Sequence, residues 1–200
     1  MKQPLGVILA GGLATRMGGG DKGLLYLGKR TLLDHVIDRL SPQVADIALN
    51  ANGDPARFAA QSLPVIADSV EGYAGPLAGV LAGLDWAATL GADSIVTAAA
   101  DTPFFPCDLV PRLQLAAEGM QHPLALAATP DPRRGKARHP TFGLWPVALR
   151  DDLRVALQDG MRKVVMWTDK HDGRVAMFPD EDAFFNVNTP DDLIRAEAML

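Results

Sequence analysis

The sequence predicts an α/β fold in which helices cover both faces of an open, mostly parallel sheet. Short apolar runs that suit buried strands alternate with segments whose apolar residues recur at helical spacing. One run, residues 94–100, is mostly apolar and carries no charge, as expected of a central parallel strand. The 200-residue chain is 48% hydrophobic and 22% charged, which is ordinary for a globular protein and excludes a disordered or fibrous chain.

The first half of the chain supplies most of the predicted sheet. Apolar runs predict strands at residues 5–10, 45–50, 64–67 and 94–100. A first helix is predicted from apolar residues at helical spacing, ended by Ser41-Pro42: Leu32, Leu33, Val36, Ile37 and Leu40. Two more helices are predicted at residues 77–90 and about 108–118. The first of these is rich in Ala and Gly, which suits close packing on a sheet.

The pattern is looser beyond residue 120. Three further strands are predicted at residues 124–128, 139–145 and 174–178, with a basic loop at 130–138 and a helix at 147–157. Thr189 and Pro190 begin a last helix, which is predicted to run to the C-terminus. The sequence shows no internal repeat and no dividing linker, so we expect a single domain over residues 1–200.

Composition narrows the function. The net charge of -5 argues against sequence-independent nucleic-acid binding, and no stretch approaches the roughly 18 uncharged residues of a membrane helix. Cys107 is the single cysteine, which excludes an internal disulfide and fits a reducing compartment, most simply the cytoplasm. The four histidines show no zinc spacing.

The segment after the first predicted strand has the features of a phosphate-binding loop. Gly11 and Gly12 follow that strand directly, and Arg16 and Lys22 follow in the same loop. Glycines let backbone N–H groups approach an anion, Arg grips phosphate oxygens in pairs and Lys adds a point charge. The dinucleotide-binding spacing is also met by three glycines, but these do not directly follow a strand: Gly18, Gly20 and Gly23.

Polar residues follow the other predicted strands. In open α/β sheets ligands bind at the carboxyl ends of the strands, which here carry Asn50 with Asn52, Asp68, and Asp101. Asp101 suits Mg²⁺, although an Asp before Thr-Pro can also cap a helix. Asp68 and the two Asn either contact a base or sugar or only make turns.

Three other segments are open to two readings. The helix start at Gly75, Pro76 and Leu77 can hold an anion or a base carbonyl, or is simply a helix entry. The basic loop is either a solvated surface or a phosphate contact; it contains Arg133, Arg134, Lys136 and Arg138. Asn186 and Asn188 either form a turn before the last helix or reach across the cleft.

These motifs together resemble the molybdenum cofactor guanylyltransferase family, in order and spacing over nearly the whole chain. The resemblance includes the glycine-rich segment 9–22, Asn50-Ala-Asn52, Asp68, residues 75–79, Asp101-Thr-Pro103, His139-Pro-Thr141 and Asn186-Val-Asn188-Thr-Pro190. It implies the three-layer, Rossmann-like fold of the wider nucleotidyltransferases, many of which activate sugar phosphates. The implied reaction transfers GMP from GTP to the phosphate of molybdenum-bound molybdopterin and releases pyrophosphate.

The resemblance also implies residue roles. Catalysis would depend on Arg16, Lys22 and Asp101, with Mg²⁺ on Asp101. GTP would contact the N-terminal half through Leu9, Ala10, Gly11, Gly12, Lys22, Asn50, Asp68, Gly75, Pro76, Leu77 and Asp101. The C-terminal half would face the pterin through His139, Asn186 and Asn188. Transient protein partners would deliver or receive the cofactor.

Other functions stay open at this stage. Relatives that use CTP tend to carry Ala-Ala-Gly where this chain has Ala10-Gly11-Gly12, which favours GTP. A CTP-using or sugar-phosphate nucleotidyltransferase is the alternative within the fold. A nucleotide-binding cofactor chaperone would bind GTP without releasing pyrophosphate, and a nicotinamide-dependent oxidoreductase would need an acidic residue in a suitable βαβ unit, which we do not find.

Overall fold

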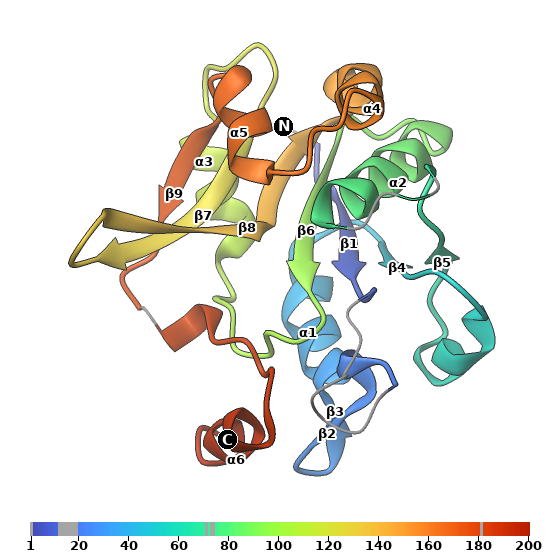
Figure 1. Ribbon diagram of the computed structural model, residues 1–200, viewed down its shortest axis with the longest axis vertical. Helices are drawn as coiled ribbons and strands as arrows, with labels where there is room; N and C mark the ends of the chain where they lie inside the picture. Colours follow the sequence, from blue (N-terminus) through green and yellow to red (C-terminus); the bar gives the residue numbers. More distant parts are fainter. Residues whose placement is uncertain (1, 12–19, 71, 73–74, 181) are drawn as a thin grey trace.

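The computed structural model describes residues 2–11, 20–70, 72, 75–180 and 182–200. A sheet of seven strands runs through its centre in the order β5-β4-β1-β6-β8-β7-β9 (Figure 1). The four N-terminal strands are parallel neighbours: β1 (Leu5–Leu9), β4 (Ile47–Asn50), β5 (Val65–Ile66) and β6 (Ser94–Ala99). The predicted strand alternation and the mostly parallel sheet are therefore confirmed.

The C-terminal strands reverse the direction of the sheet. The long strand β8 (Gly135–Pro146) pairs antiparallel with both β6 and β7 (Ala125–Asp131). The edge strand β9 (Arg174–Met177) lies parallel to β7. The C-terminal half of the chain thus extends the sheet beyond β6, with β8, β7 and β9 on one side of β6 and β1, β4 and β5 on the other (Figure 1).

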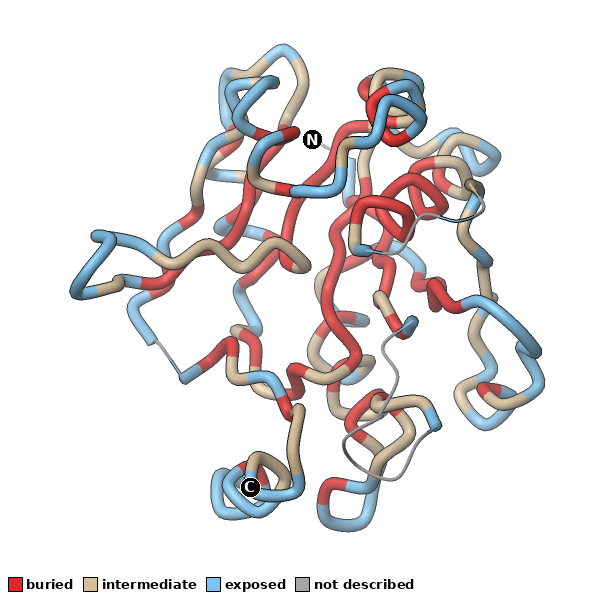
Figure 2. The backbone as a smooth tube through the Cα atoms, viewed as in Figure 1, coloured by how far each residue is buried: buried red, intermediate tan, exposed pale blue. Residues whose placement is uncertain are grey.

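Helices cover both faces of the sheet and make three layers. On one face, a buried cluster joins α1 (Leu32–Leu40) and α3 (Leu109–Ala116) to the strands. On the other, a second cluster joins α2 (Pro76–Thr89), α4 (Arg150–Gln158) and α5 (Val164–Lys170). Figure 2 shows that buried residues follow the central strands and α2, while the outer loops are exposed.

Local sequence explains where the helices begin and how closely they pack. Thr31 and Asp34 form a reciprocal capping box at the start of α1, as Thr189 and Asp192 do for α6 (Pro190–Glu197). A Cβ added at Gly83 would lie 2.8 Å from side-chain atoms of Val7 and Ile95. The Gly- and Ala-rich sequence of α2 therefore serves close packing on β1 and β6, as predicted.

The basic segment 130–138, predicted as a loop, is a β-hairpin. Strand β7 continues to Asp131 and β8 begins at Gly135, with Thr129 opposite Ala137. Asp131 Oδ1 accepts hydrogen bonds from the backbone N–H groups of Arg133 and Arg134, each at 2.8 Å, and closes the turn. The charged side chains suggested a loop, but the strands are paired through backbone hydrogen bonds, which a charged sequence does not reveal.

Several short elements were not predicted. They are the hairpin β2 (Tyr26–Leu27) and β3 (Arg30–Thr31), the 3₁₀ segments η2 (Lys22–Leu24), η3 (Ser41–Gln43), η4 (Pro55–Gln61) and η6 (Asp182–Phe184), and helix α5. The helix predicted at 147–157 begins as the 3₁₀ turn η5 (Val147–Leu149), and the last helix ends at Glu197, short of the C-terminus. None of the helices in the described part of the chain has the length and apolarity that crossing a bilayer requires.

Candidate active site

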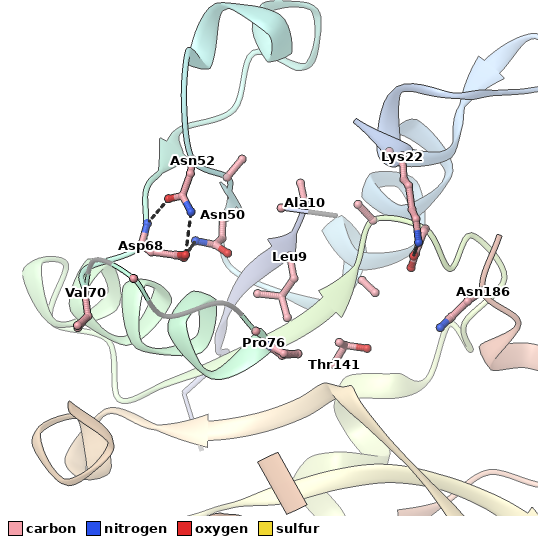
Figure 3. A pocket seen from close by; sticks show the side chains of 18 residues that line it. Leu9, Ala10, Lys22, Asn50, Asn52, Asp68, Val70, Pro76, Thr141 and Asn186 are labelled. Atoms are coloured by element: carbon pink, nitrogen blue, oxygen red, sulfur yellow. Dashed lines mark hydrogen bonds and ion pairs between the residues drawn. The ribbon is translucent and has the colours of Figure 1, made fainter. Parts of the chain in front are cut away.

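A cavity of about 790 Å³ opens at the carboxyl ends of β1, β4, β5 and β6. Its volume lies in the range of roughly 300–1,000 Å³ that small-molecule sites occupy. Figure 3 shows the polar side chains in two groups on opposite sides of the cavity, with Leu9 and Ala10 between them. The described residues that were predicted to bind the nucleotide and line it are Leu9, Ala10, Gly11, Lys22, Asn50, Asp68, Gly75, Pro76 and Asp101.

The first group is a carboxylate held by two amides. Asn50 Nδ2 donates to Asp68 Oδ1 at 2.9 Å, and Asn52 Nδ2 donates to Asp68 Oδ2 at 2.8 Å. Asn52 Oδ1 in turn accepts from the backbone N–H of Asp68 at 2.8 Å. Both oxygens of Asp68 are thus fixed in orientation at the cavity wall (Figure 3), and each keeps lone-pair capacity for a donor on a ligand.

Gly79 makes room for this group, which sequence reasoning did not anticipate. Asn50 is 5% exposed and lies against α2. A Cβ added at Gly79 would lie only 2.2 Å from Asn50 Oδ1. Any side chain at position 79 would therefore displace the Asn50 amide from its present position.

The second group surrounds Lys22 and Asp101. Lys22 Nζ lies 3.4 Å from Asp101 Oδ2 and also donates to Asn188 Oδ1. Both charged side chains are mostly buried, with 20% and 19% of their surfaces exposed. A cation and a carboxylate that are largely shielded from solvent interact more strongly with a charged ligand than they would on an open surface.

The chain before α6 completes this second group. Val187 N–H donates to the Asp101 carbonyl at 2.9 Å, and the Thr102 hydroxyl donates to Asn186 Oδ1 at 2.6 Å. Asn186 lines the cavity and Asn188 reaches it through Lys22. The two Asn therefore do more than form a turn: they bring the C-terminal segment to the edge of the central strand.

The start of α2 contributes backbone to the cavity wall. Gly75 precedes the helix with φ +132°, a conformation that favours glycine, and Pro76 occupies the first turn. Both residues line the cavity. Leu77, predicted alongside them as a nucleotide contact, is instead 1% exposed and packs in the core beneath, because the helical turn directs it toward the sheet.

His139 lies behind the cavity wall rather than in it. Its ring stacks on Phe184 with centroids 4.2 Å apart, and Nε2 lies 3.0 Å from the Thr129 hydroxyl. Burial lowers the pKa of His139 from its usual 6.5 to about 4, so the ring is neutral at pH 7. Of the predicted His139–Thr141 segment, it is Thr141 that lines the cavity.

Other predicted residues fall elsewhere. Arg16 and Gly12 lie outside the described residues. The basic hairpin does not line the cavity: Arg133, Arg134 and Lys136 are exposed, and Arg138 forms an ion pair with Asp169 at 2.6 Å. The remaining histidines are structural or peripheral; for example, His35 Nε2 contacts the Leu27 carbonyl and His171 Nε2 contacts Asp152.

Asp101 suits a hard divalent cation such as Mg²⁺. Its contact with Lys22 is long, and its side chain is open to the cavity. Within the described ranges, no three His, Cys, Asp or Glu side chains gather into a metal-binding group. Mg²⁺ keeps several waters and takes one or two carboxylates with substrate phosphates, so a single carboxylate at this position fits that ion.

Comparison with known sequences agrees with the geometry. The profile of the MobA-like NTP transferase domain matches residues 6–174. A molybdenum cofactor guanylyltransferase from Cereibacter sphaeroides is 53% identical over 195 residues, which cover 98% of this chain and 96% of that protein. Another from a Bradyrhizobium species is 52% identical over 199 residues, with 97% and 92% covered.

Solved structures share the fold at lower identity. The molybdopterin-guanine dinucleotide biosynthesis protein A of Archaeoglobus fulgidus superposes with a TM-score of 0.71 at 24% identity, covering 98% of this chain and 97% of that one. The 4-diphosphocytidyl-2C-methyl-D-erythritol synthase of Anaerococcus prevotii gives 0.75 at 15% identity, with 99% and 98% covered. The predicted three-layer, Rossmann-like fold of the nucleotidyltransferases (nucleotide-diphospho-sugar transferase-like) is thereby confirmed.

Proposed function

We propose that this chain, which belongs to the MobA-like NTP transferase family, is a molybdenum cofactor guanylyltransferase. It is a nucleotidyltransferase that moves GMP from GTP to the phosphate of molybdenum-bound molybdopterin and releases pyrophosphate. The observation that carries the proposal is one cavity with a cation–carboxylate pair, Lys22 and Asp101, on one side and an oriented acceptor, Asp68, on the other. This arrangement suits a ligand with an anionic tail and a hydrogen-donating base.

GTP occupies this cavity with its triphosphate toward Lys22 and its base or sugar toward Asp68. An ionised carboxylate only accepts hydrogen bonds, and guanine offers N–H donors on its base-pairing edge, whereas cytosine offers fewer there. Leu9 and Ala10 lie between the two ends (Figure 3), and Gly11, the next residue, also lines the cavity. Arg16, on the segment that follows, adds a second cation for the phosphates.

Asp101 would hold the Mg²⁺ ion, which supplies charge neutralisation to the triphosphate when bound. The protein's own part is electrostatic. Lys22 stabilises negative charge on the phosphates, and the Asn188 amide oxygen holds its ammonium group in place. Removing one such preorganised group typically lowers the rate by about 10² to 10³.

The reaction needs no general base. The attacking group is a phosphate monoester, whose second pKa is about 6, so it is mostly ionised at neutral pH. Its oxygen attacks the α-phosphorus of GTP while pyrophosphate leaves in line. The described residues that line the cavity accordingly include no histidine.

The acceptor enters from the C-terminal half of the domain. Thr141 and Asn186 line that side of the cavity (Figure 3), and Asn188 joins it to Lys22. In this proposal, one domain binds the nucleotide at the ends of the parallel strands and the pterin at residues from the C-terminal half. We place the reaction in the cytoplasm, where the exposed thiol of Cys107 stays reduced, and expect transient partners that deliver or receive the cofactor.

One assay tests the proposal. The purified protein is incubated with Mg²⁺, molybdenum-bound molybdopterin and GTP, CTP or ATP, and both pyrophosphate and the dinucleotide product are measured. We expect product with GTP and its near loss in Lys22→Ala and Asp101→Ala. Lys2→Ala, which removes an exposed ion pair with Asp93, is the control and should keep full activity.

The outcomes separate the alternatives. Preference for CTP would identify a cytidylyltransferase, and GTP binding without pyrophosphate release would identify a cofactor-binding chaperone. Wild-type turnover by a folded Lys22→Ala or Asp101→Ala protein would overturn the placement of the active site.

A further inference from the structure

We propose that Arg57 is a positioning residue, which fixes both ends of the nucleotide cavity without touching the nucleotide. This inference rests on the proposed function, because it assumes a ligand that spans the cavity from Lys22 to Asp68. Arg57 lies in η4, after β4, and is not among the residues that line the cavity. Its effect on a bound nucleotide must therefore pass through the residues that it holds.

Each of the three guanidinium nitrogens of Arg57 has an acceptor within hydrogen-bonding distance. Nε lies 2.7 Å from Asp21 Oδ2, Nη1 donates to the Asp54 carbonyl at 2.6 Å, and Nη2 donates to the Asn52 carbonyl at 2.5 Å. The ring of Phe58 lies under it, 4.6 Å from the guanidinium carbon to the centroid. A planar group with donors in a fixed fork can make these contacts together, whereas a lysine ammonium cannot reproduce that pattern.

One arm of this arrangement leads to the phosphate end. Asp21 directly precedes Lys22, and only 11% of its side chain is exposed, so the ion pair with Arg57 is largely shielded from water. Removal of one partner from a shielded ion pair is costly because it leaves the other charge uncompensated, whereas loss of a surface pair costs little. Arg57 therefore anchors the backbone from which Lys22 reaches Asp101 and Asn188.

The other arm leads to the base end. Arg57 holds the carbonyl of Asn52, whose side chain makes the paired contacts with the carboxylate and backbone N–H of Asp68. A shift of this loop would turn the Asp68 carboxylate away from its present orientation. One side chain thus joins two loops, at residues 21 and 52, that come from different connections of the sheet.

The test compares nucleotide affinity with stability. Dissociation constants for Mg²⁺-GTP are measured by calorimetry on the wild-type protein and on Arg57→Gln, Arg57→Lys and Asp21→Asn. We expect Arg57→Gln to raise the dissociation constant about tenfold, within the range of couplings between residues in contact. Arg57→Lys, which keeps the charge beside Asp21, should recover part of that loss.

Fragment probes separate the two arms. Inorganic pyrophosphate and guanosine are each titrated as competitors of a fluorescent GTP analogue. Arg57→Gln should weaken both fragments, whereas Asp21→Asn should weaken pyrophosphate and leave guanosine within about twofold. A purely structural role would move both fragments together in both variants. Asp21→Asn also keeps the proposal testable if Arg57→Gln fails to fold.

Arg154→Gln is the matched control. Arg154 pairs with Asp85 at 2.6 Å, with 33% and 27% of the side chains exposed, and joins α4 to α2 away from the cavity lining. It should lose similar stability but keep GTP affinity. Unchanged affinity in folded Arg57→Gln, or an equal loss in Arg154→Gln, overturns the proposal; failure of the wild-type protein to bind GTP overturns the proposed function itself, and this inference with it.

Discussion

Gly11, which lines the cavity, and Gly79, which packs against Asn50, make room for different partners, and alanine substitutions can tell the two roles apart. A Cβ at Gly11 would meet no atom of the described residues within 4 Å, whereas one at Gly79 would collide with the Asn50 amide. We expect Gly11→Ala to leave stability within about 0.5 kcal/mol and to weaken GTP binding, because the added methyl group intrudes on the ligand's space. Gly79→Ala should cost about 1–3 kcal/mol through overpacking and weaken binding as well.

Urea unfolding and GTP titration of the two variants check this prediction. The wild-type protein is the reference for both variants. An exposed glycine such as Gly160 cannot serve as an alanine control, because its backbone φ of +90° would itself strain an alanine. A large stability loss in Gly11→Ala would contradict the view that the glycine is reserved for a ligand.

His139 makes stability depend on pH. Burial lowers its pKa from 6.5 to about 4, so between these values the unfolded chain binds a proton that the folded chain does not. The contribution of this group is therefore complete above about pH 6.5 and is lost as the pH falls toward 4. We expect His139→Gln, which keeps an acceptor for Thr129 but does not titrate, to lose less stability between pH 7 and pH 5 than the wild-type protein.

Urea unfolding at the two pH values measures the difference. His122→Gln serves as the control because His122 lies in the turn before β7, away from the Phe184 stack. Identical pH dependence of His139→Gln and the wild-type protein would contradict the shifted pKa of His139.

At the scale of elements, the start of α6 links helix stability to the proposed active site. Asp192 Oδ2 accepts hydrogen bonds from the backbone N–H groups of Asn188 and Thr189 at 3.0 and 2.9 Å, and the Thr189 hydroxyl accepts from Asp192 N–H at 3.1 Å. The backbone N–H groups of Asn188 and Thr189, together with the Thr189 hydroxyl, hold the pKa of Asp192 below its usual value. The capping box thus fixes the backbone of the residue whose side chain holds Lys22.

We expect Thr189→Ala to destabilise the protein by about 1 kcal/mol, as loss of a helix cap does, and also to lower turnover. Thr31→Ala, which removes the matching cap of α1, is the control: it should cost similar stability with a smaller effect on turnover. Thermal unfolding and the pyrophosphate assay measure the two quantities. Equal losses of turnover in both variants would show that the cap of α6 has no special link to Lys22.

The elements that were predicted correctly carry strong local signals. The apolar run of β6 and the helical spacing before Ser41-Pro42 each depend on residues close in sequence. The basic hairpin and α5 lacked such signals: the hairpin is held by backbone pairing between charged residues, and α5 is only seven residues long. Their conformation follows from the sheet and the core around Trp167, which a local pattern does not reveal.

At the scale of the whole molecule, the sequence predicts those residues of the proposed site that follow a strand, but not the contacts between segments that are distant in the chain. Asn50, Asp68 and Asp101 follow from the rule for parallel sheets. Asn188 contacts Lys22, and Arg57 contacts Asp21. The residues of each pair are far apart in the chain, so no sequence spacing could predict these contacts. His139 shows the opposite error, since a matched motif placed it in the site while the ring packs behind the wall.

The cavity joins both halves of the chain, so nucleotide binding should stabilise the whole molecule. Its lining combines the parallel strands with Thr141 and Asn186 from the C-terminal half. A ligand that binds only the folded protein adds about 2.7 kcal/mol at a concentration of 100 times its dissociation constant. For a chain of this length each kcal/mol raises the melting temperature by roughly 2–4 °C, so saturating Mg²⁺-GTP should raise it by about 5–10 °C.

Thermal unfolding followed by circular dichroism tests this shift, with Mg²⁺-ATP as the ligand control and Lys22→Ala as the protein control. The GTP shift should disappear in Lys22→Ala at the same nucleotide concentration, because the triphosphate loses its cation. It should persist in Lys2→Ala, whose ion pair with Asp93 lies on the surface. An equal shift in Lys22→Ala would place the nucleotide elsewhere on the molecule, and an equal shift with ATP would show that Asp68 and its two amides do not select the base.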